Sequence, residues 1–503
     1  QADGSPGATA AVAVALHPGG NSSFGMNLIG AMLSCFLTAT GGISLGTVIF
    51  PCGVDPQWLT IGMNIGLLTA FVANVVFSLR TSLPVAVGGT LIPAITVLSD
   101  FMEAEIGPDE PDTVLAALAV NTFCFGALVF IAGKVGVDSL VKSCPYAVFV
   151  GFLGYTGLSL LIYSIQIVDS NFTDITDLDA YQSLFQANTT KQLLPPVLVA
   201  VAVAMLKRDW SWKPHWMTRL DAFLVPIVAV LMTGVFYATC FGARPDVSTD
   251  EILRIARSEG WVFGSAQQHN VTSNTTTTFS ITEFTHVWTA RSLNRIKWDL
   301  LASSSFATLV FQTFAIGCLT LVEDAFATAQ FCSSRCPGSA AVDIDSEVQT
   351  GGIANMVLAL VGGLPANVVF SYSATVLRIG ASNRVFFLLQ ALMSSLFFVF
   401  GNQIVRVMPK MIPSFLLFWV GLDLSMWALW DLRPHNSSQN LSDSGRRIGV
   451  NVSHQAPTVI RRRPGFDRIE YCVVVTMTLV GILQGSGLMM DVGLLFAFVI
   501  TLW

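Results

Sequence analysis

Two neighbouring carboxylates, Glu323 and Asp324, lie inside a mostly apolar stretch of the sequence, LTLVEDAFATAQF. A charged side chain in the middle of a membrane costs at least about 2.5–3.5 kcal/mol by insertion scales, so it usually faces a cavity or a partner. A carboxyl group in such a place can also take up and release a proton near neutral pH. The pair therefore predicts substrate binding and proton coupling. The alternative is that both residues lie at a cytoplasmic helix end, where charge costs little.

Two short apolar segments, SLPVAVGGT and GGLPANVVFSYSAT, each contain a Leu-Pro pair, two glycines and hydroxyl groups. Each has a Pro-containing, extended-looking stretch and continues into a segment too short to span. Such half-helices offer unpaired N–H groups and a positive dipole end, which suit an anion or a polar group. The alternatives are ordinary Gly/Pro-kinked spans and serines that cap a helix. The residues expected to contact substrate are Gly89, Thr90, Ser371, Tyr372 and Ser373.

The composition indicates that these segments lie in a membrane. Of 503 residues, 53% are hydrophobic and 12% are charged, about half the charged share of a soluble protein, and the mean hydropathy is +0.64. The net charge of −6 leaves no basic excess for nucleic acid. No nucleotide-binding loop and no complete metal-ligand set are present, so we expect no cofactor, no metal and no enzymatic activity.

Gly and Pro breaks divide the apolar runs into about fourteen segments, of which the two short ones are the third and the tenth. Paired, interrupted segments at corresponding places are typical of transporters built from inverted repeats. We therefore expect an all-α polytopic membrane protein of seven plus seven spans, with short extended stretches before half-helices 3 and 10. Its expected parts are a cytoplasmic tail at 1–24, a first repeat at 25–240, an extracytoplasmic loop at 241–298 and a second repeat at 299–503.

The distribution of basic residues orients the chain. Most of its 26 Lys and Arg residues fall on loops that face the cytoplasm if the N-terminus is cytoplasmic. Four glycosylation sequons then fall in the two long outward loops, at Asn171, Asn188, Asn270 and Asn274. The chain starts at Gln1 without a recognisable signal peptide and stops at Trp503 inside an apolar run, so we expect further residues beyond both ends.

The stretch GGIANMVLALVGGLPANVVFSYSATVLRIGAS resembles the signature region of the SulP family of sulfate permeases and anion transporters. In that family an acidic residue precedes the ninth span, Gly-Gly-x-Pro follows it, and a Ser-rich segment begins the tenth; Glu347, 362–365 and 370–373 match this pattern. LTLVEDAFATAQF is similar to the family's eighth span. The resemblance covers about 25–503, with strong motifs at 320–385. It implies a seven-plus-seven inverted-repeat fold with core and gate domains, a homodimer, and often a cytoplasmic STAS domain.

Two positions depart from the family pattern. Where the family often carries Arg after the serine that matches Ser373, this chain has Ala374, and Asp324 stands where the family more often has Ser. Both differences make the site less positive, which favours a neutral or cationic substrate or proton coupling. The sequence also resembles a eukaryotic branch of the family linked with vacuolar membranes and basic amino acids.

The resemblance favours a secondary transporter that moves a sulfate-like inorganic anion by elevator-type alternating access. Proton-coupled transport of basic or neutral amino acids is the runner-up, and a non-transporting membrane scaffold is the alternative from another class. The expected partners are the solute, the lipid bilayer and a second copy of the chain. The expected location is a plasma or vacuolar-type membrane.

Overall fold

The computed structural model describes residues 24–50, 54, 56–136, 146–169, 172, 178–207, 223–243, 246–263, 293–335, 342–381, 384–431 and 468–502. Within these ranges, nine helices are long and apolar enough to cross a membrane. The protein is thus an all-α membrane protein, as the sequence predicts. The number of about fourteen crossings, the two repeats and the boundaries at 24, 240 and 298 stay predictions.

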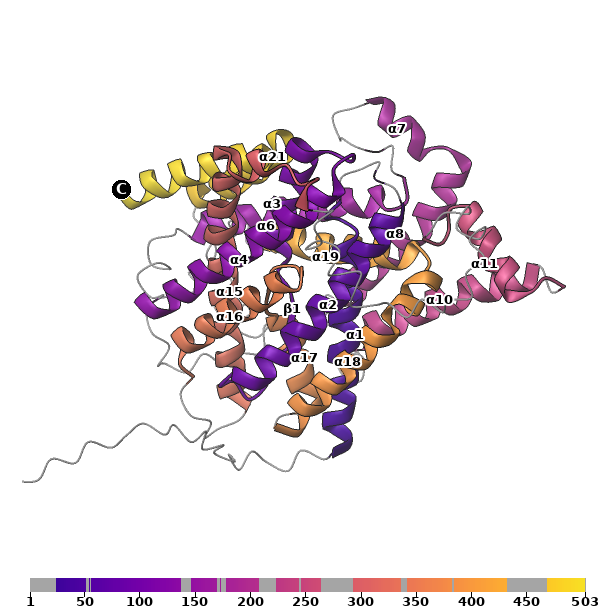
Figure 1. Cartoon of the computed structure of the whole chain (residues 1–503), viewed down its shortest axis with the longest axis horizontal. Helices are drawn as coiled ribbons and strands as arrows, with labels where there is room; N and C mark the ends of the chain where they lie inside the picture. The colour runs from indigo at the N-terminus through magenta and orange to yellow at the C-terminus, as the bar shows by residue number, and fades with distance from the viewer. Residues whose placement is uncertain are drawn as a thin grey trace, which may run out of the picture.

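A core set of helices surrounds the centre of the molecule (Figure 1). Its members pack on one another through the pairs α1–α2, α2–α18, α4–α16 and α3–α15. The core set consists of α1 (Phe24–Gly46), α2 (Pro56–Arg80), α3 (Ile92–Phe101), α4 (Pro111–Val135), α15 (Ser304–Arg335), α16 (Ile344–Leu360), α17 (Phe370–Ile379) and α18 (Arg384–Val407).

A second group, the flanking set, is built around α6 and α19, which pack against each other. It meets the core set through contacts of α1 with α19 and of α3 with α6 and α21. The flanking set consists of α6 (Tyr146–Gln166), α8 (Ala187–Lys207), α10 (Leu224–Ala243), α19 (Met411–Met426) and α21 (Arg468–Leu502). The shorter elements are η1 (Met102–Ile106), α7 (Leu178–Leu184), α11 (Thr249–Ser258), α14 (Trp298–Leu301) and η4 (Trp427–Asp431).

Two short strands pair with each other inside the core set, and we call this pair the strand crossing. β1 (Gly88–Thr90) pairs antiparallel with β2 (Ala366–Val368), with Gly89 opposite Asn367. β1 leads into the ten-residue helix α3, and β2 leads into the ten-residue helix α17. The expected extended stretches before two half-helices are therefore confirmed, and the two strands lie side by side.

Glycines allow α1 and α2 to approach within backbone contact. A Cβ atom built on Gly42 would lie 2.4 Å from the carbonyl oxygen of Gly66, and one on Gly62 would lie 2.1 Å from that of Gly46. Small residues spaced by four at a helix interface are the usual way for membrane helices to pack this closely. The pair forms one wall of the core set, against which β1 lies.

Candidate functional site at the crossing of the two strands

Asp324 lies on α15 beside the start of α17. Its carboxylate accepts a hydrogen bond from the side-chain amide of Asn367 and one, at 3.4 Å, from the backbone N–H of Phe370. Phe370 is the first residue of α17, and the preceding Val369 makes no side-chain cap. The first N–H groups of a helix have no partner within it and form the positive end of its dipole. A carboxylate from another helix therefore occupies the N-terminus of this half-helix.

Asn367 presents an acceptor at the same junction. The residue is only 2% exposed, and its side-chain oxygen has no hydrogen-bond partner among the described residues. A buried amide oxygen without a partner is rare, because it has lost its water without gaining a bond. Its amide nitrogen is already bonded to Asp324, so the open position on Asn367 accepts a hydrogen bond and does not donate one.

Gly89 stands opposite Asn367 in the strand pair, so the two residues face the same side of the ribbon. A Cβ atom on Gly89 would lie 2.8 Å from Val369, 3.6 Å from Tyr372 and 3.8 Å from Thr38. The phenol oxygen of Tyr372 approaches Gly41 of α1. Helices α1, α15 and α17 thus meet around this face, which we call the Asn367 face.

Thr90 does not join this group. Side chains alternate along a strand, so Thr90 points to the side opposite Gly89 and Asn367. On that side a Cβ atom at Gly88 would meet Phe77 and Ala73 of α2. Thr90 is 7% exposed, and its hydroxyl has no partner among the described residues. Its predicted contact with substrate stays a prediction that this placement does not support.

The serines predicted at the start of α17 differ in their surroundings. Ser373 is 1% exposed, and its hydroxyl accepts from the N–H of Val87 at 3.0 Å and donates to the carbonyl of Val369 at 2.9 Å. It therefore fastens α17 to the stretch that leads into β1. The side chain of Ser371 is exposed. Glu323 is half-buried on α15, about 100° around the helix from Asp324, so the two carboxylates do not share a face.

Side-chain amides fix both strands. Asn74 of α2 accepts from the N–H of Gly88 at 2.9 Å. Asn355 of α16 accepts from the N–H of Ala366 and donates to the carbonyl of the same residue, both at 2.8 Å. These strand residues lie in the interior of the core set, where every backbone group needs a partner. The amides supply that partner and hold the crossing in one register.

A second anchor lies at the entrance to the first segment. Glu347, whose position matches the acidic residue of the family pattern, is 2% exposed. Its carboxylate accepts from the hydroxyl of Thr81 at 2.8 Å and from the N–H and hydroxyl of Ser82 at 2.6 and 2.8 Å. Its place in the pattern is explained by this anchoring of the chain between α2 and β1.

The predicted glycosylation sites add little to the site. Asn171, Asn270 and Asn274 lie outside the described residues, and for Asn188 only the backbone, in the first turn of α8, is described. Modification at all four stays a prediction.

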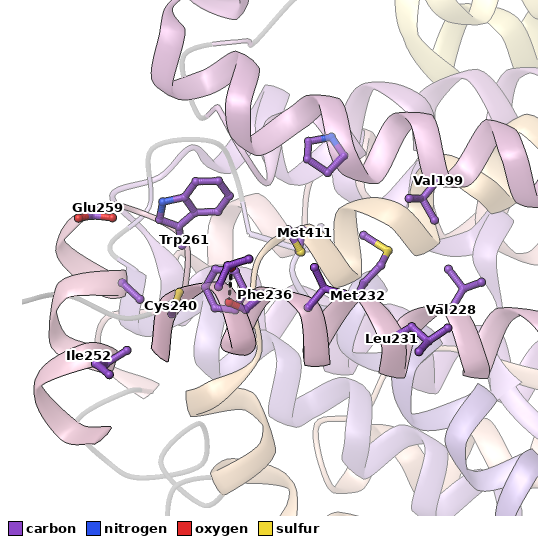
Figure 2. A pocket seen from close by; sticks show the side chains of 14 residues that line it. Val199, Val228, Leu231, Met232, Phe236, Cys240, Ile252, Glu259, Trp261 and Met411 are labelled. Atoms are coloured by element: carbon purple, nitrogen blue, oxygen red, sulfur yellow. Dashed lines mark hydrogen bonds between the residues drawn. The ribbon is translucent and has the colours of Figure 1, made fainter. Parts of the chain in front are cut away.

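The cavity in Figure 2, of about 610 Å³, lies elsewhere. It is an apolar groove between α8, α10, α11 and α19, walled by residues such as Val199, Met232, Phe236 and Trp261. None of the residues discussed above lines it, and its few polar groups offer little to orient a charged solute. We therefore place the candidate site at the strand crossing.

Asn367 is the member of this site that the sequence did not identify. A polar side chain within the apolar stretch PANVVF is a usable signal, because such residues inside a membrane usually bond across helices. Its partner Asp324 lies 43 residues earlier, however, so the contact becomes visible only in the folded chain.

Known proteins resemble this chain in sequence and in fold. The vacuolar basic amino acid transporter VSB1 of Saccharomyces cerevisiae is 21% identical over 421 residues, which are 82% of this chain and 37% of the yeast protein. This chain therefore spans a little over a third of the length of that relative.

Among solved structures, the transmembrane domain of the cyanobacterial bicarbonate transporter BicA superposes with a TM-score of 0.55 at 16% identity, covering 92% of this chain and 96% of that domain. The murine Slc26a9 anion transporter gives 0.58 at 13% identity, covering 95% and 68%. These similarities show a shared fold.

The sequence profile of the sulfate permease family matches residues 39–439. Because this match covers most of the chain, the chain belongs to the sulfate permease family.

Proposed function

We propose that this chain carries a small solute with cationic, N–H-donating groups, of the basic amino acid type, across its membrane by alternating access. The single observation behind this proposal is the position of Asp324. Its carboxylate lies at the N-terminus of α17, where an anionic solute would otherwise find free N–H groups and the positive end of the dipole.

The charge balance at this place supports a cation. A helix N-terminus carries about half an elementary positive charge, whereas an aspartate carries a full negative one, so their sum is negative. Two unit charges about 4 Å apart interact by roughly 4 kcal/mol at an effective dielectric constant of 20. A divalent anion such as sulfate would therefore be repelled by several kcal/mol beside Asp324. The described partners of this carboxylate, an amide and a backbone N–H, carry no charge that compensates it.

The open hydrogen-bonding position points the same way. The side-chain oxygen of Asn367 accepts and cannot donate, and Asp324 is also an acceptor. Ammonium and guanidinium groups carry several donors and no acceptor, whereas sulfate carries only acceptors. The name of the yeast relative, a vacuolar basic amino acid transporter, agrees with this polarity.

Asp324 also suits proton coupling, because a carboxylate can take up a proton when the solute leaves and release it when the solute binds. We further propose the cytoplasmic N-terminus that the basic loops favour, a vacuolar-type membrane, and a homodimer, the last on family resemblance. In this proposal the core set moves relative to the flanking set, and the solute site at β1 and β2 moves with it from one side of the membrane to the other.

The test is uptake of labelled arginine and labelled sulfate into proteoliposomes, with and without a pH gradient. We expect arginine uptake that grows with the gradient, and its loss in Asp324→Asn. Asp299→Asn is the matched control, because Asp299 is an exposed carboxylate shortly before α15. If the wild type takes up sulfate but not arginine, the result would instead support the inorganic-anion alternative. If neither solute moves, the scaffold alternative gains.

A further inference from the structure

Asp100, near the C-terminal end of α3, accepts hydrogen bonds from three residues on other helices. Its carboxylate accepts from the hydroxyl of Tyr163 at 2.9 Å and from the hydroxyl of Tyr155, both on α6. It also accepts from the backbone N–H of Ser486 on α21, at 3.3 Å. One carboxylate thus gathers donors from two other helices.

The bond from α21 exists because that helix is broken. Gly485 has φ +83°, a left-handed conformation that glycine adopts readily and other residues rarely do. Beyond this residue the helix starts again, so the N–H of Ser486 needs a partner outside the regular helical pattern. Asp100 supplies it and acts as the N-cap of the second part of α21.

All three bonds cross the boundary between the two sets of helices. Asp100 belongs to the core set, through α3, whose other end adjoins β1. Tyr155, Tyr163 and Ser486 belong to the flanking set. Any movement of α3 relative to α6 and α21 must therefore separate this carboxylate from its donors.

A cavity next to Asp100 gives the bonded groups room to part. Its volume is about 130 Å³, enough for several water molecules. It is lined mainly by polar side chains and by the glycines around the break in α21: Asp100, Glu103, Tyr155, Ser159, Tyr163, Gln166, Gly481 and Gly485. Water in this cavity can satisfy the carboxylate and the tyrosine hydroxyls when they separate.

We infer that Asp100 is a positioning residue that latches the half-helix α3 to α6 and α21, and that its bonds to Tyr155, Tyr163 and Ser486 break and re-form in each transport cycle. The part that concerns transport rests on the proposed function. The latch itself does not depend on which solute is carried.

The test measures how often the latch opens. Ser159, which is 5% exposed and lines the cavity, is replaced by Cys, and the rate at which this cysteine reacts with a maleimide is followed by mass spectrometry of its peptide. This background is combined with Asp100→Asn, which cannot accept as the carboxylate does, and with Tyr163→Phe, which removes one donor. Glu105→Gln is the matched control, because Glu105 is an exposed acid on the adjoining segment η1.

We expect labelling to accelerate about tenfold or more in Asp100→Asn and several-fold in Tyr163→Phe, as loss of hydrogen bonds to a charged group requires. Glu105→Gln should label at the parent rate. In transport assays, kcat should change while KM for the solute changes less than about twofold, because the strand crossing is untouched. Unchanged labelling in both latch variants would overturn the inference, whether or not a transported solute has been found. If Asp100→Asn fails to fold, Tyr163→Phe alone decides.

Discussion

The molecule contains two similar units, each a three-residue strand that leads into a ten-residue helix. The unit in the first half of the chain is β1 with α3, and the unit in the second half is β2 with α17. In both, an asparagine on an earlier helix bonds the strand backbone: Asn74 in one unit and Asn355 in the other. At the start of α17 the first N–H meets the carboxylate of Asp324. α3 instead begins with Ile92-Pro93, and proline has no N–H to offer.

The two units share the amide anchors of their strands but differ in where their carboxylates lie. The amides that hold the two strands are alike, so the backbone of the crossing is built by the same means on both sides. The charge is not shared, because the carboxylate of the first unit, Asp100, lies at the far end of α3. The N-terminus of α17 therefore meets a negative group that α15 supplies, whereas α3 carries its own negative group and presents it to the flanking set.

Replacing Asn367 should have the largest effect of the variants that probe this difference. In Asn367→Leu, Asp324 loses a donor and the junction loses its open acceptor. We expect solute uptake to fall about tenfold or more, as loss of hydrogen bonds to charged groups does. Asn121→Leu is the matched control: Asn121 is also buried, bonds to Thr313 and has an oxygen without a described partner, but it lies on α4. Equal losses in both variants would argue for a general effect of a buried amide.

Replacing the two scaffold asparagines tests whether the strands are held alike. In Asn355→Leu both backbone groups of Ala366 lose their amide partner, and in Asn74→Leu the N–H of Gly88 does. Each buried group left without a partner costs about 1–3 kcal/mol. We expect both variants to unfold at a lower temperature in detergent than the parent. A variant that unfolds at the parent temperature would show that its strand is held by other contacts.

Ser373→Ala should lower the free energy of unfolding by about 1–3 kcal/mol, since the buried N–H of Val87 loses its acceptor. Ser371→Ala, at an exposed position in the same turn, should stay within about 0.5 kcal/mol of the parent. Thermal unfolding of the purified proteins measures both. Loss of uptake in Ser373→Ala without any change in stability would instead favour the substrate contact that the sequence predicts.

Thr90→Val should have the smallest effect. The hydroxyl has no described partner, so replacing it by a methyl group of similar shape removes no described hydrogen bond. We expect the free energy of unfolding to stay within about 0.5 kcal/mol of the parent, and uptake to be retained. A variant without uptake would return Thr90 to the substrate site.

The sequence predicted the membrane helices and the two strand-to-half-helix segments, because long apolar runs and paired Leu-Pro breaks are local patterns. It pointed to both half-helices and to Asp324. It did not reveal that Thr90 and Asn367 face opposite sides, because that depends on strand register, and a shift of one residue reverses every side chain. It also left Asp100 out, although an acid within an apolar segment is a signal in itself. The donors of Asp100 lie 55, 63 and 386 residues away.

The most direct test of the account is equilibrium binding of labelled arginine to the purified protein, with unlabelled sulfate as competitor. Binding does not require coupling or transport, so it reports the charge preference of the crossing alone. We expect the parent to bind arginine without competition from sulfate beyond an ionic-strength control, and Asp324→Asn to bind it at least about tenfold more weakly. Arginine binding that is unchanged in Asp324→Asn, or a parent that binds sulfate in its place, would contradict the assignment of Asp324 as the group that selects a cation.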